Sequence, residues 1–420
     1  MTDSSPLYDA LVLGAGAAGL LCAARAAERG KRVLVLEKNN KAAVKVLMSG
    51  GTRCNLTHDA SPGDIADAYA RLAGGAEGKA KARWLRPALA RLTPDALIAL
   101  FAAEGLATKI ESTGKVFPES DRALDVQRAL LRMVASSGAE VALGEAALSV
   151  ERSAGGFVVA TSRRTLRARN VVVAVGGRSW PGCGTTGDGY AWAKALGHRV
   201  VPPRPALVPL TSTERWALDL QGVTLSDVRL RLIEGERGDV RIDRRGSLLF
   251  THFGLSGPVA MDCSRFVTQR PDAIQWRAVL DLAPSVGEEQ LQERLAERGG
   301  QTVLSLLGEV VPRRVAEATL GQAGVPLERR LAELSRAQRR ATVDAVKRPT
   351  LRLAGSLGFK KAEVTAGGVD LDEVDPRTCQ SRLVPGLYFI GEVLDLDGPI
   401  GGYNFQAAFS TAALAGDSVA

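Results

Sequence analysis

The chain has 420 residues, of which 45% are hydrophobic and 24% are charged, a composition typical of a globular protein with two or three domains. No stretch approaches the roughly 18 uninterrupted apolar residues of a membrane-spanning helix, and the first residues lack a signal-peptide pattern, so we expect a cytoplasmic protein without a membrane partner. The five cysteines are far apart and include no C-x-x-C pair, which argues against a disulfide framework and against a metal site.

The first predicted unit spans residues 9–38 and consists of an apolar strand, a glycine turn, an alanine-rich helix and a second apolar strand. In this context the spacing of Gly14, Gly16 and Gly19 is typical of a dinucleotide-binding turn. The first glycine permits the tight turn, the second lets the backbone approach a pyrophosphate, and the third lets the helix lie close to the sheet. Glu37 ends the second strand, where its carboxylate can accept hydrogen bonds from both hydroxyls of an adenosine ribose. Because an acid there disfavours a 2′-phosphate, the predicted ligand is FAD or NAD rather than NADP.

A second glycine-rich segment follows at residues 45–58, with the sequence KVLMSGGTRCNLTH. The backbone around Gly51 can press against a flat ligand, while Arg53 and Asn55 supply a cation and an amide for hydrogen bonds. The run resembles the glycine-glycine-x-Arg-Cys-Asn loop of the bacterial BaiN/RdsA-type family of NAD(P)/FAD-dependent oxidoreductases. The resemblance implies that this loop lies beside a flavin.

Residues 65–116 form an alanine-rich region with a helical pattern. Pro87 and Pro94 are predicted to begin helices, because proline is favoured in the first helical turn. Two further segments, 141–150 and 156–161, are predicted strands. They resemble the small sheet that these flavoproteins lay across the main one.

The apolar strand at residues 170–177, NVVVAVGG, ends in a turn of small residues. It resembles the Ala-Thr-Gly-Gly strand of FAD proteins, with valine in the threonine position, and the resemblance implies that it passes close to the cofactor. A second G-x-G-x-x-G follows at 182–187. It lacks an immediately preceding strand and a following strand that ends in an acid, so we do not interpret it as a second dinucleotide site. The resemblance instead places Gly187 and Asp188 at the start of a helix in the FAD domain.

Beyond residue 198 the sequence becomes rich in proline and then in short strands of leucine, valine and arginine, before a helical pattern appears. The predicted fold class is α/β, with a Rossmann-like FAD-binding domain of three layers around a parallel central sheet. This domain comprises residues 1–200 and 363–420. The inserted domain, 201–362, is predicted to contain a β-barrel, at about 201–283 and 346–362, and a helical part at about 284–345.

The C-terminal segment, residues 386–416, contains a short apolar strand, an acid and a glycine-led helix start. The acid, Glu392, is suited to the hydroxyls of a ribitol chain. A helix that begins at Gly402, Tyr403 and Asn404 can direct its positive end at the N1/O2 edge of a flavin and stabilise the negative charge that appears on reduction. This segment favours FAD as the nucleotide, and it also matches the family.

The fingerprint and the resemblance together predict one cofactor site built from both ends of the chain. FAD is predicted to be bound non-covalently, with NAD(P)H as a transient reductant. The predicted cofactor-binding residues are Gly14, Gly16, Ala18, Gly19, Glu37, Lys38, Gly51, Arg53, Cys54, Asn55, Ala174, Gly176, Gly177, Gly187, Asp188, Gly391, Glu392, Gly402, Tyr403 and Asn404.

The resemblance implies reduction or desaturation of carbon-carbon bonds, in a uridine of ribosomal RNA or in steroid-like enones. Hydride addition at C6 of uridine requires an acid that protonates C5, and the candidates are Cys54 and His252. A packing role for Cys54 and a structural hydrogen bond for His252 are the alternatives. Dihydrouridine formation in ribosomal RNA is the favoured prediction. Reduction of a small-molecule enone, and a flavoprotein whose FAD is structural or regulatory, are the competing ones.

The formal net charge is +8, and the positive charge is concentrated between residues 312 and 352, where ten basic and four acidic residues lie. Concentrated positive charge suits phosphate contacts. Arg336, Arg339 and Arg340 are therefore predicted to contact an RNA substrate. A solvated helical face is the alternative explanation, and in that case the partner is a small-molecule substrate.

Overall fold

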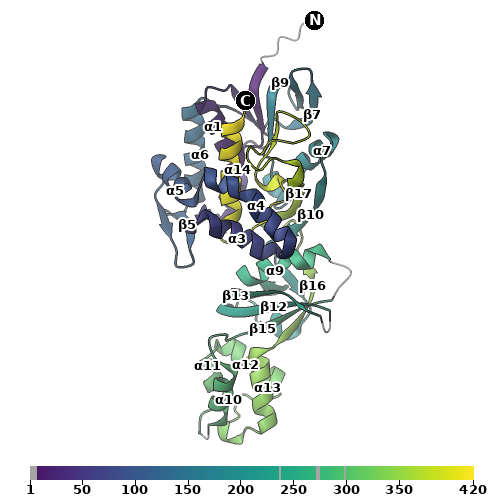
Figure 1. Cartoon of the computed structure of the whole chain (residues 1–420). Coiled ribbons are helices and arrows are strands. Elements are labelled where there is room, and N and C mark those ends of the chain that lie inside the picture. Colours follow the sequence, from purple (N-terminus) through teal and green to yellow (C-terminus); the bar gives the residue numbers. More distant parts are fainter. Residues whose placement is uncertain (1–6, 236–237, 271–274, 298) are drawn as a thin grey trace. The chain divides into compact units, whose positions relative to one another are not determined.

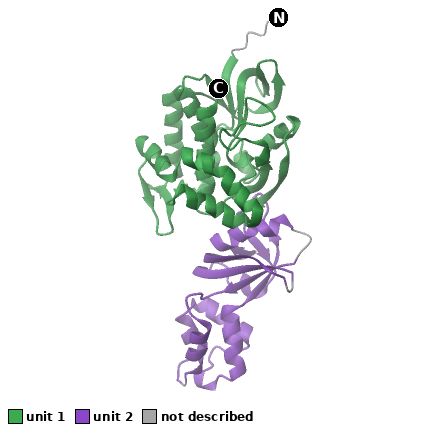
Figure 2. Cartoon of the chain, viewed as in Figure 1, with its two compact units in different colours: residues 1–205, 363–420 green, residues 206–362 purple. Residues whose placement is uncertain are grey.

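The computed structural model of the chain (Figure 1) describes residues 7–235, 238–270, 275–297 and 299–420. The chain divides into two compact units, which Figure 2 draws in different colours. Unit 1 comprises Met1–Pro205 and Glu363–Ala420, and unit 2 comprises Ala206–Ala362. Unit 2 is therefore an insertion into unit 1, and the two ends of the sequence fold together.

Unit 1 is built around a sheet of seven described strands (Figure 1). In spatial order these are β6 (Glu140–Leu143), β2 (Val33–Glu37), β1 (Leu7–Leu13), β9 (Thr165–Val173), β8 (Gly156–Thr161) and β7 (Ala147–Ser153), and β18 (Leu387–Phe389) pairs with β9. The strands β6, β2, β1, β9 and β18 run parallel, whereas β8 and β7 extend the sheet antiparallel. Every residue of β2 is buried, which explains why its sequence is a continuous apolar run rather than an alternating one.

Helices α1 to α6 and α14 of unit 1 pack on one another, α7 packs on β17 (Val364–Val369), and α1 also packs on β1 and β2. In the described chain these helices are α1 (Ala17–Glu28), α2 (Val44–Met48), α3 (Pro62–Ala73), α4 (Gly75–Arg91), α5 (Pro94–Ala103), α6 (Ala123–Ser137), α7 (Asp188–Ala195) and α14 (Tyr403–Ser418). Helix α1 contacts both α6 and α14, and α14 also contacts α4. An ion pair of 2.8 Å between Arg25 of α1 and Asp417 of α14 joins side chains 392 positions apart.

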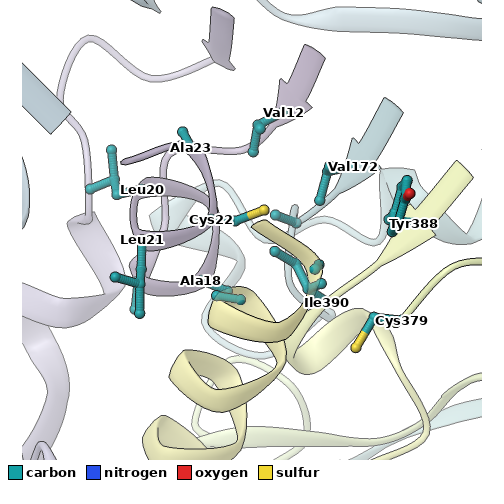
Figure 3. Close-up of a cluster of buried hydrophobic side chains, with 14 of the residues drawn as sticks. Val12, Ala18, Leu20, Leu21, Cys22, Ala23, Val172, Cys379, Tyr388 and Ile390 are labelled. Carbon is teal, nitrogen blue, oxygen red and sulfur yellow. The ribbon is translucent and has the colours of Figure 1, made fainter. Parts of the chain in front are cut away.

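The core of unit 1 contains residues from both ends of the chain (Figure 3). Cys22 of α1, Val172 of β9 and Ile390, next to β18, are each at most 1% exposed and belong to one hydrophobic cluster. Burial of this apolar surface is the main term that holds the elements together. The C-terminal segment thus completes the unit that β1 begins.

The prediction that Pro87 begins a helix is wrong, because Pro87 lies inside α4. Proline in a helix interior removes one backbone hydrogen bond and is costly, at about 3 kcal/mol. Trp84 and Leu85 on the same helix are buried, and this packing offsets the cost. Pro94, in contrast, begins α5 directly after the N-cap residue Thr93.

Two strand assignments also differ from the prediction. The segment 141–150 contributes to two strands, because β6 joins the main sheet whereas β7 pairs with β8. Strand β10 (Val200–Ala206), predicted within the barrel, instead pairs with β17 (Val364–Val369) in a two-stranded sheet. Its prolines lack the backbone N–H that an interior barrel strand would need. A further small sheet has the order β3 (Thr57–His58), β5 (Lys115–Pro118) and β4 (Thr108–Ile110).

Unit 2 contains a closed antiparallel barrel and a group of helices (Figure 1). The barrel order is β11 (Leu210–Ser212), β14 (Gly254–Ser256), β13 (Val240–Thr251), β12 (Thr224–Glu234), β15 (Trp276–Asp281) and β16 (Thr350–Ser356), and pairing of β11 with β16 closes it. Its described helices are α8 (Arg215–Leu218), α9 (Pro258–Gln269), α10 (Glu288–Ala296), α11 (Val303–Gly308), α12 (Arg313–Ala323) and α13 (Arg336–Lys347). Helices α10 to α13 lie between β15 and β16 in the sequence.

The predicted α/β class, with a parallel central sheet and an inserted barrel, is confirmed by these pairings. Among the helices of the described ranges, none is long and apolar enough to cross a bilayer. The described residues also contain no group of three or more His, Cys, Asp or Glu side chains that could hold a metal ion.

Candidate functional site

The three fingerprint glycines stand in different surroundings. A Cβ on Gly14, where φ is 101°, would lie 2.7 Å from the carbonyl oxygen of Ala174, and a Cβ on Gly19 would lie 1.9 Å from the carbonyl oxygen of Gly14. A Cβ on Gly16, the N-cap of α1, would meet no described atom within 4 Å. The turn is therefore closely packed on its inner side and open at the helix N-terminus, where unpaired backbone N–H groups attract an anion.

The Glu37 carboxylate holds the fingerprint turn in place. Its Oε2 accepts a hydrogen bond of 2.9 Å from the backbone N–H of Ala15, and its Oε1 accepts one of 2.8 Å from that of Asn39. A carboxylate offers about four acceptor positions. Glu37 thus retains acceptor capacity for ribose hydroxyls while it fixes the turn after β1 and the loop after β2.

Lys38 and Asp188, both predicted to contact the cofactor, are paired with each other. The Lys38 ammonium donates to Thr186 and to Asp188, each at 2.6 Å. The Asn39 amide donates to the carbonyl oxygen of Cys183 at 3.1 Å. These contacts fasten the segment that carries Gly187 next to the end of β2.

The loop that follows α2 is held in a strained conformation. Thr52 and Cys54 both have positive φ, at 69° and 62°, and Gly51 between Gly50 and Thr52 has φ 67°. Positive φ is unfavourable for residues with a Cβ, and such strain is concentrated at functional sites. The Oδ1 atom of Asn55 is buried and has no hydrogen-bond partner in the described chain. An unpaired buried acceptor of this kind requires a donor from a ligand or from a bound water.

The Arg53 side chain connects this loop to the three-stranded sheet of β3, β5 and β4. Its guanidinium lies 2.7 Å from Glu111 and 3.3 Å from Asp121, and it stacks on the Phe117 ring at 3.9 Å from the centroid. Hydrogen bonds from Lys109 and from Arg53 lower the pKa of Asp121. The arrangement uses the Arg53 cation to fix the loop backbone.

Glu392 accepts hydrogen bonds from three separate segments of unit 1. Its Oε1 accepts hydrogen bonds from the Ser179 hydroxyl at 2.6 Å and from the Thr365 backbone N–H at 2.8 Å, and its Oε2 pairs with Lys45 at 2.5 Å. A Cβ on Gly177 would lie 2.3 Å from the Thr365 hydroxyl, so this position requires glycine. The turn after β9, with Gly177, is thereby packed against β17 and Glu392.

The glycine before Glu392 places this segment beside the fingerprint helix. Gly391 begins the short helix η5 (Gly391–Val393), has φ 68°, and a Cβ on it would lie 3.2 Å from the Cβ of Ala18. Gly176, after β9, also has positive φ, at 74°. Residues predicted from three distant motifs therefore come together in unit 1.

The start of α14 is fixed by contacts of its N-cap residue Gly402 and of its first two residues. Gly402 has φ 95°, and a Cβ there would lie 2.3 Å from the carbonyl oxygen of Thr57. The Tyr403 ring stacks on His58 with 4.7 Å between centroids. The Asn404 side chain accepts from the Gly398 N–H at 2.8 Å and donates to the Gly398 carbonyl at 3.0 Å. The positive end of a 16-residue helix is thus held rigidly.

A sequence model described as the HI0933-like protein Rossmann domain matches residues 8–418. The chain belongs to this family. It is 35% identical over 409 residues to the ribosomal RNA dihydrouridine synthase of Escherichia coli (strain K12), with 96% of each chain covered. It is 29% identical over 416 residues to the 3-dehydro-bile acid delta(4,6)-reductase of Clostridium scindens, covering 97% of this chain and 98% of that protein. Among solved structures, 3-ketosteroid delta1-dehydrogenase from Sterolibacterium denitrificans shares the fold, with a TM-score of 0.52 at 15% identity and coverage of 98% and 99%.

The family match confirms the predicted resemblance, and the chain is a flavin-dependent oxidoreductase of this family. Sequence reasoning missed three side chains that surround Glu392, namely Lys45, Ser179 and Thr365. Thr365 lies two positions before Gly367 and Gly368, whose φ angles are positive, at 84° and 145°. A glycine pair after a threonine in an apolar strand is the signal that could have identified it.

The two candidate acids of this oxidoreductase belong to different units. Cys54 in unit 1 is fully buried, and burial raises the pKa of its thiol to about 12, against a smaller lowering by Ser49. His252 in unit 2 is exposed in the turn between β13 and β14, with 4.9 Å between the centroids of its ring and the Phe253 ring. The Cys54 thiol therefore retains its proton at neutral pH.

Titration of the buried thiols should destabilise the protein at alkaline pH. Burial raises the pKa of Cys54 and of Cys22 from 9.0 to about 12. Above about pH 9 these thiols ionise in the unfolded chain but stay protonated in the folded one, so stability present below pH 9 is lost as pH rises toward 12. We expect the urea midpoint to fall between about pH 8 and pH 10.5, and to fall less steeply in Cys54→Ala. A midpoint that does not change with pH, or an unaltered slope in the variant, would contradict this.

The basic residues of unit 2 differ in how far they are neutralised within the unit. Arg313 pairs with Glu317 at 2.9 Å, and Arg348 pairs with Glu288 at 2.5 Å. Arg339 donates to the backbone carbonyl of Leu334 at 3.4 Å. In contrast, Arg336 and Arg340 on α13 are exposed and make no hydrogen bond within the described chain. Only part of the basic surplus is therefore available to an anionic partner.

Proposed function

We propose that the chain binds FAD non-covalently and reduces the 5,6 double bond of a uridine in ribosomal RNA, with NAD(P)H as the reductant. The observation that carries the proposal is the open N-terminus of α1 at Gly16, between two closely packed glycines and beside Glu37. Two relatives named ribosomal RNA dihydrouridine synthase, from Escherichia coli and Haemophilus influenzae, are 35% and 33% identical and match nearly their whole length.

The residues of unit 1 fit the parts of FAD one by one. The α1 N-terminus at Gly16 suits the pyrophosphate, and Glu37 suits the adenosine ribose. Glu392 suits the ribitol chain, and its three donors hold the carboxylate in a fixed orientation. The unpaired Oδ1 of Asn55 and the start of α14 at Gly402 offer an acceptor and a positive helix end to the flavin ring. When bound, FAD supplies the two-electron redox chemistry that no side chain can supply.

Reduction of the uridine adds a hydride at C6 and a proton at C5, and the proton must come from an acid of the enzyme or from solvent. Cys54 and His252 are the candidates that we propose. A thiol that keeps its proton at neutral pH can donate it only to a carbanion-like carbon, which is the species that hydride addition creates. An exposed imidazole can exchange its proton with water directly.

A small-molecule enone is the second candidate substrate. It is favoured by the relative named 3-dehydro-bile acid delta(4,6)-reductase, which this chain matches over 98% of that protein's length. An enone and uridine share a carbon-carbon double bond conjugated to a carbonyl, so the same hydride chemistry serves both. The difference lies in the charge of the substrate, since RNA is a polyanion.

The proposal is tested by cofactor analysis and by gene deletion. The purified protein should be yellow and should release FAD, rather than FMN, on heat denaturation. Ribosomal RNA from the deletion strain should lack a dihydrouridine by mass spectrometry, and the wild-type gene should restore it. A colourless protein that cannot be reconstituted with FAD would refute the cofactor, and unchanged ribosomal RNA would favour the enone.

Glu37→Ala should weaken FAD binding by roughly 1.5 to 3 kcal/mol, the scale of charge-assisted hydrogen bonds. The variant loses the proposed ribose acceptor and also the acceptor for the N–H groups of Ala15 and Asn39. Glu37→Gln keeps the shape and one acceptor oxygen, so its loss should be intermediate. Titration of the apoproteins with FAD measures the three affinities. Full retention of flavin by Glu37→Ala after dialysis would show that the fingerprint is misassigned.

A further inference from the structure

Lys81 on α4 is a buried cation that pairs with two acids of one distant segment. Its side chain is 4% exposed, and its ammonium lies 2.9 Å from Asp395 and 2.9 Å from Asp397, at 16% and 1% exposure. Glu77, one turn earlier on α4, is 3.3 Å away and largely exposed. Lysine is almost never buried this deeply unless it is paired. The ammonium therefore neutralises two carboxylates that are separated from it by more than 300 positions in the sequence.

The two acids belong to the irregular segment 394–402, which connects η5 to α14. The segment begins directly after Glu392 and its neighbour Val393, and it ends at Gly402, so proposed contacts to the cofactor lie at both of its ends. Most of its residues are buried although it forms no regular strand or helix. A buried segment without regular structure depends on side chains to hold its conformation.

Other contacts connect the same cluster to Glu392. The Oδ1 of Asp395 that binds Lys81 also accepts a hydrogen bond of 3.1 Å from the backbone N–H of Gly367 in β17. Thr365 in the same strand donates its N–H to Glu392 at 2.8 Å. The Lys81 cation is thus linked through Asp395 and β17 to the acid that we assign to the ribitol chain.

The far end of the segment is held by the neighbouring helix α3. The Tyr69 hydroxyl donates to the carbonyl oxygen of Tyr403 at 3.1 Å, and the Tyr69 ring packs against Gly398 so closely that a Cβ there would lie 2.6 Å from it. Helices α3 and α4 pack on each other. The pair α3 and α4 therefore holds the segment near both ends.

We infer that Lys81 is a positioning residue for the cofactor, because its charge is what allows Asp395 and Asp397 to lie together and fix segment 394–402. This inference rests on the proposed FAD site. Without the ammonium, two carboxylates face each other with little access to water, and like charges in such surroundings repel strongly. The segment relieves this by moving, which displaces Glu392 and the start of α14. The role is electrostatic, so it depends on the charge balance rather than on the lysine as such.

The test compares three variants by titration of the apoprotein with FAD and by visible circular dichroism of the bound flavin. Lys81→Met should raise the FAD dissociation constant by at least about tenfold and alter the flavin spectrum. Lys79→Met, two residues away on the exposed side of α4, should match the parent. Lys81→Met combined with Asp397→Asn lowers the number of buried charges by two and should recover most of the lost affinity.

Each outcome bears on one of the two claims. A parent that binds no FAD refutes the proposed cofactor site and, with it, this inference. A parent that binds FAD together with a Lys81→Met variant of equal affinity and spectrum refutes the inference alone. If Lys81→Met is unfolded by far-ultraviolet circular dichroism, the double variant decides, since it should be folded and bind FAD. A double variant that is unfolded, or folded and still defective, overturns the positioning role.

Discussion

Gly16→Val should bind FAD at least about a hundredfold more weakly than the parent, while its apoprotein unfolds at the parental temperature. A Cβ at Gly16 would meet no described atom within 4 Å, and the backbone there is extended, with φ −80° and ψ −174°. A β-branched residue adopts that conformation without strain. The added methyl groups would instead occupy the space that we assign to the pyrophosphate. Loss of binding without loss of stability is therefore the signature of a ligand contact.

Gly19→Val provides the contrast, because it should destabilise the protein itself. A Cβ at Gly19 would lie 1.9 Å from the carbonyl oxygen of Gly14 and 3.3 Å from the Cβ of Ala174. Helix α1 would have to move away from the sheet, and overpacking of this kind costs about 1 to 3 kcal/mol or more. Thermal unfolding of both apoproteins and FAD titration separate the two effects. Parental FAD affinity in Gly16→Val would show that the pyrophosphate does not bind at this turn.

The fingerprint was predictable because its signals are local. An apolar strand, three spaced glycines and a terminal acid fix the backbone path by short-range sterics. The contact of Glu37 with the N–H of Ala15 was not predicted, and it adds a hydrogen bond that holds the turn. The predicted start of α5 at Pro94 succeeded because its signal is also local. The prediction that Pro87 begins a helix failed because the burial of a helix face can override a local signal. That burial depends on residues that are distant in the sequence.

Contacts between side chains of distant segments could not be predicted from the sequence. Lys38 and Asp188 were each predicted to face the cofactor, and nothing in their local sequence shows that they pair with each other at 2.6 Å. Lys81 lies in an alanine-rich helix and looks like any exposed lysine, yet it is buried against two acids from the other end of the chain. Ion pairs of this kind are set by tertiary packing, and no periodicity reveals them.

The excess of basic residues in unit 2 is a second case in which tertiary contacts matter, and this case bears on whether the substrate is RNA. Charge counts alone could not separate arginines that hold the unit together from arginines that remain available. Arg313 and Arg348 are neutralised by acids of their own unit, whereas Arg336 and Arg340 are exposed on α13 without a hydrogen bond in the described chain. An RNA contact is therefore best sought at α13.

Arg336→Ala combined with Arg340→Ala should weaken binding of ribosomal RNA fragments if RNA is the substrate. Each phosphate contact that is lost removes about 0.7 to 0.9 from the slope of log affinity against log salt concentration. The double variant should therefore lose up to about 1.4 to 1.8 of the parental slope. Adding Arg339→Ala tests the third predicted contact. The FAD content and the rate of flavin reduction by NAD(P)H should stay at the parental level.

A matched control removes the same charge from the same unit. Arg215 and Arg313 are both highly exposed and paired with an acid one turn away, at 3.1 and 2.9 Å, so their replacement by alanine changes the net charge equally without removing free arginines. RNA affinity and its salt slope should change less in this control than in the α13 variant. A small apolar enone carries no phosphate, so its turnover should be the same in both variants at every salt concentration. Equal RNA affinity in the parent and the α13 variant, or a parental affinity independent of salt, would instead assign the site to the small molecule.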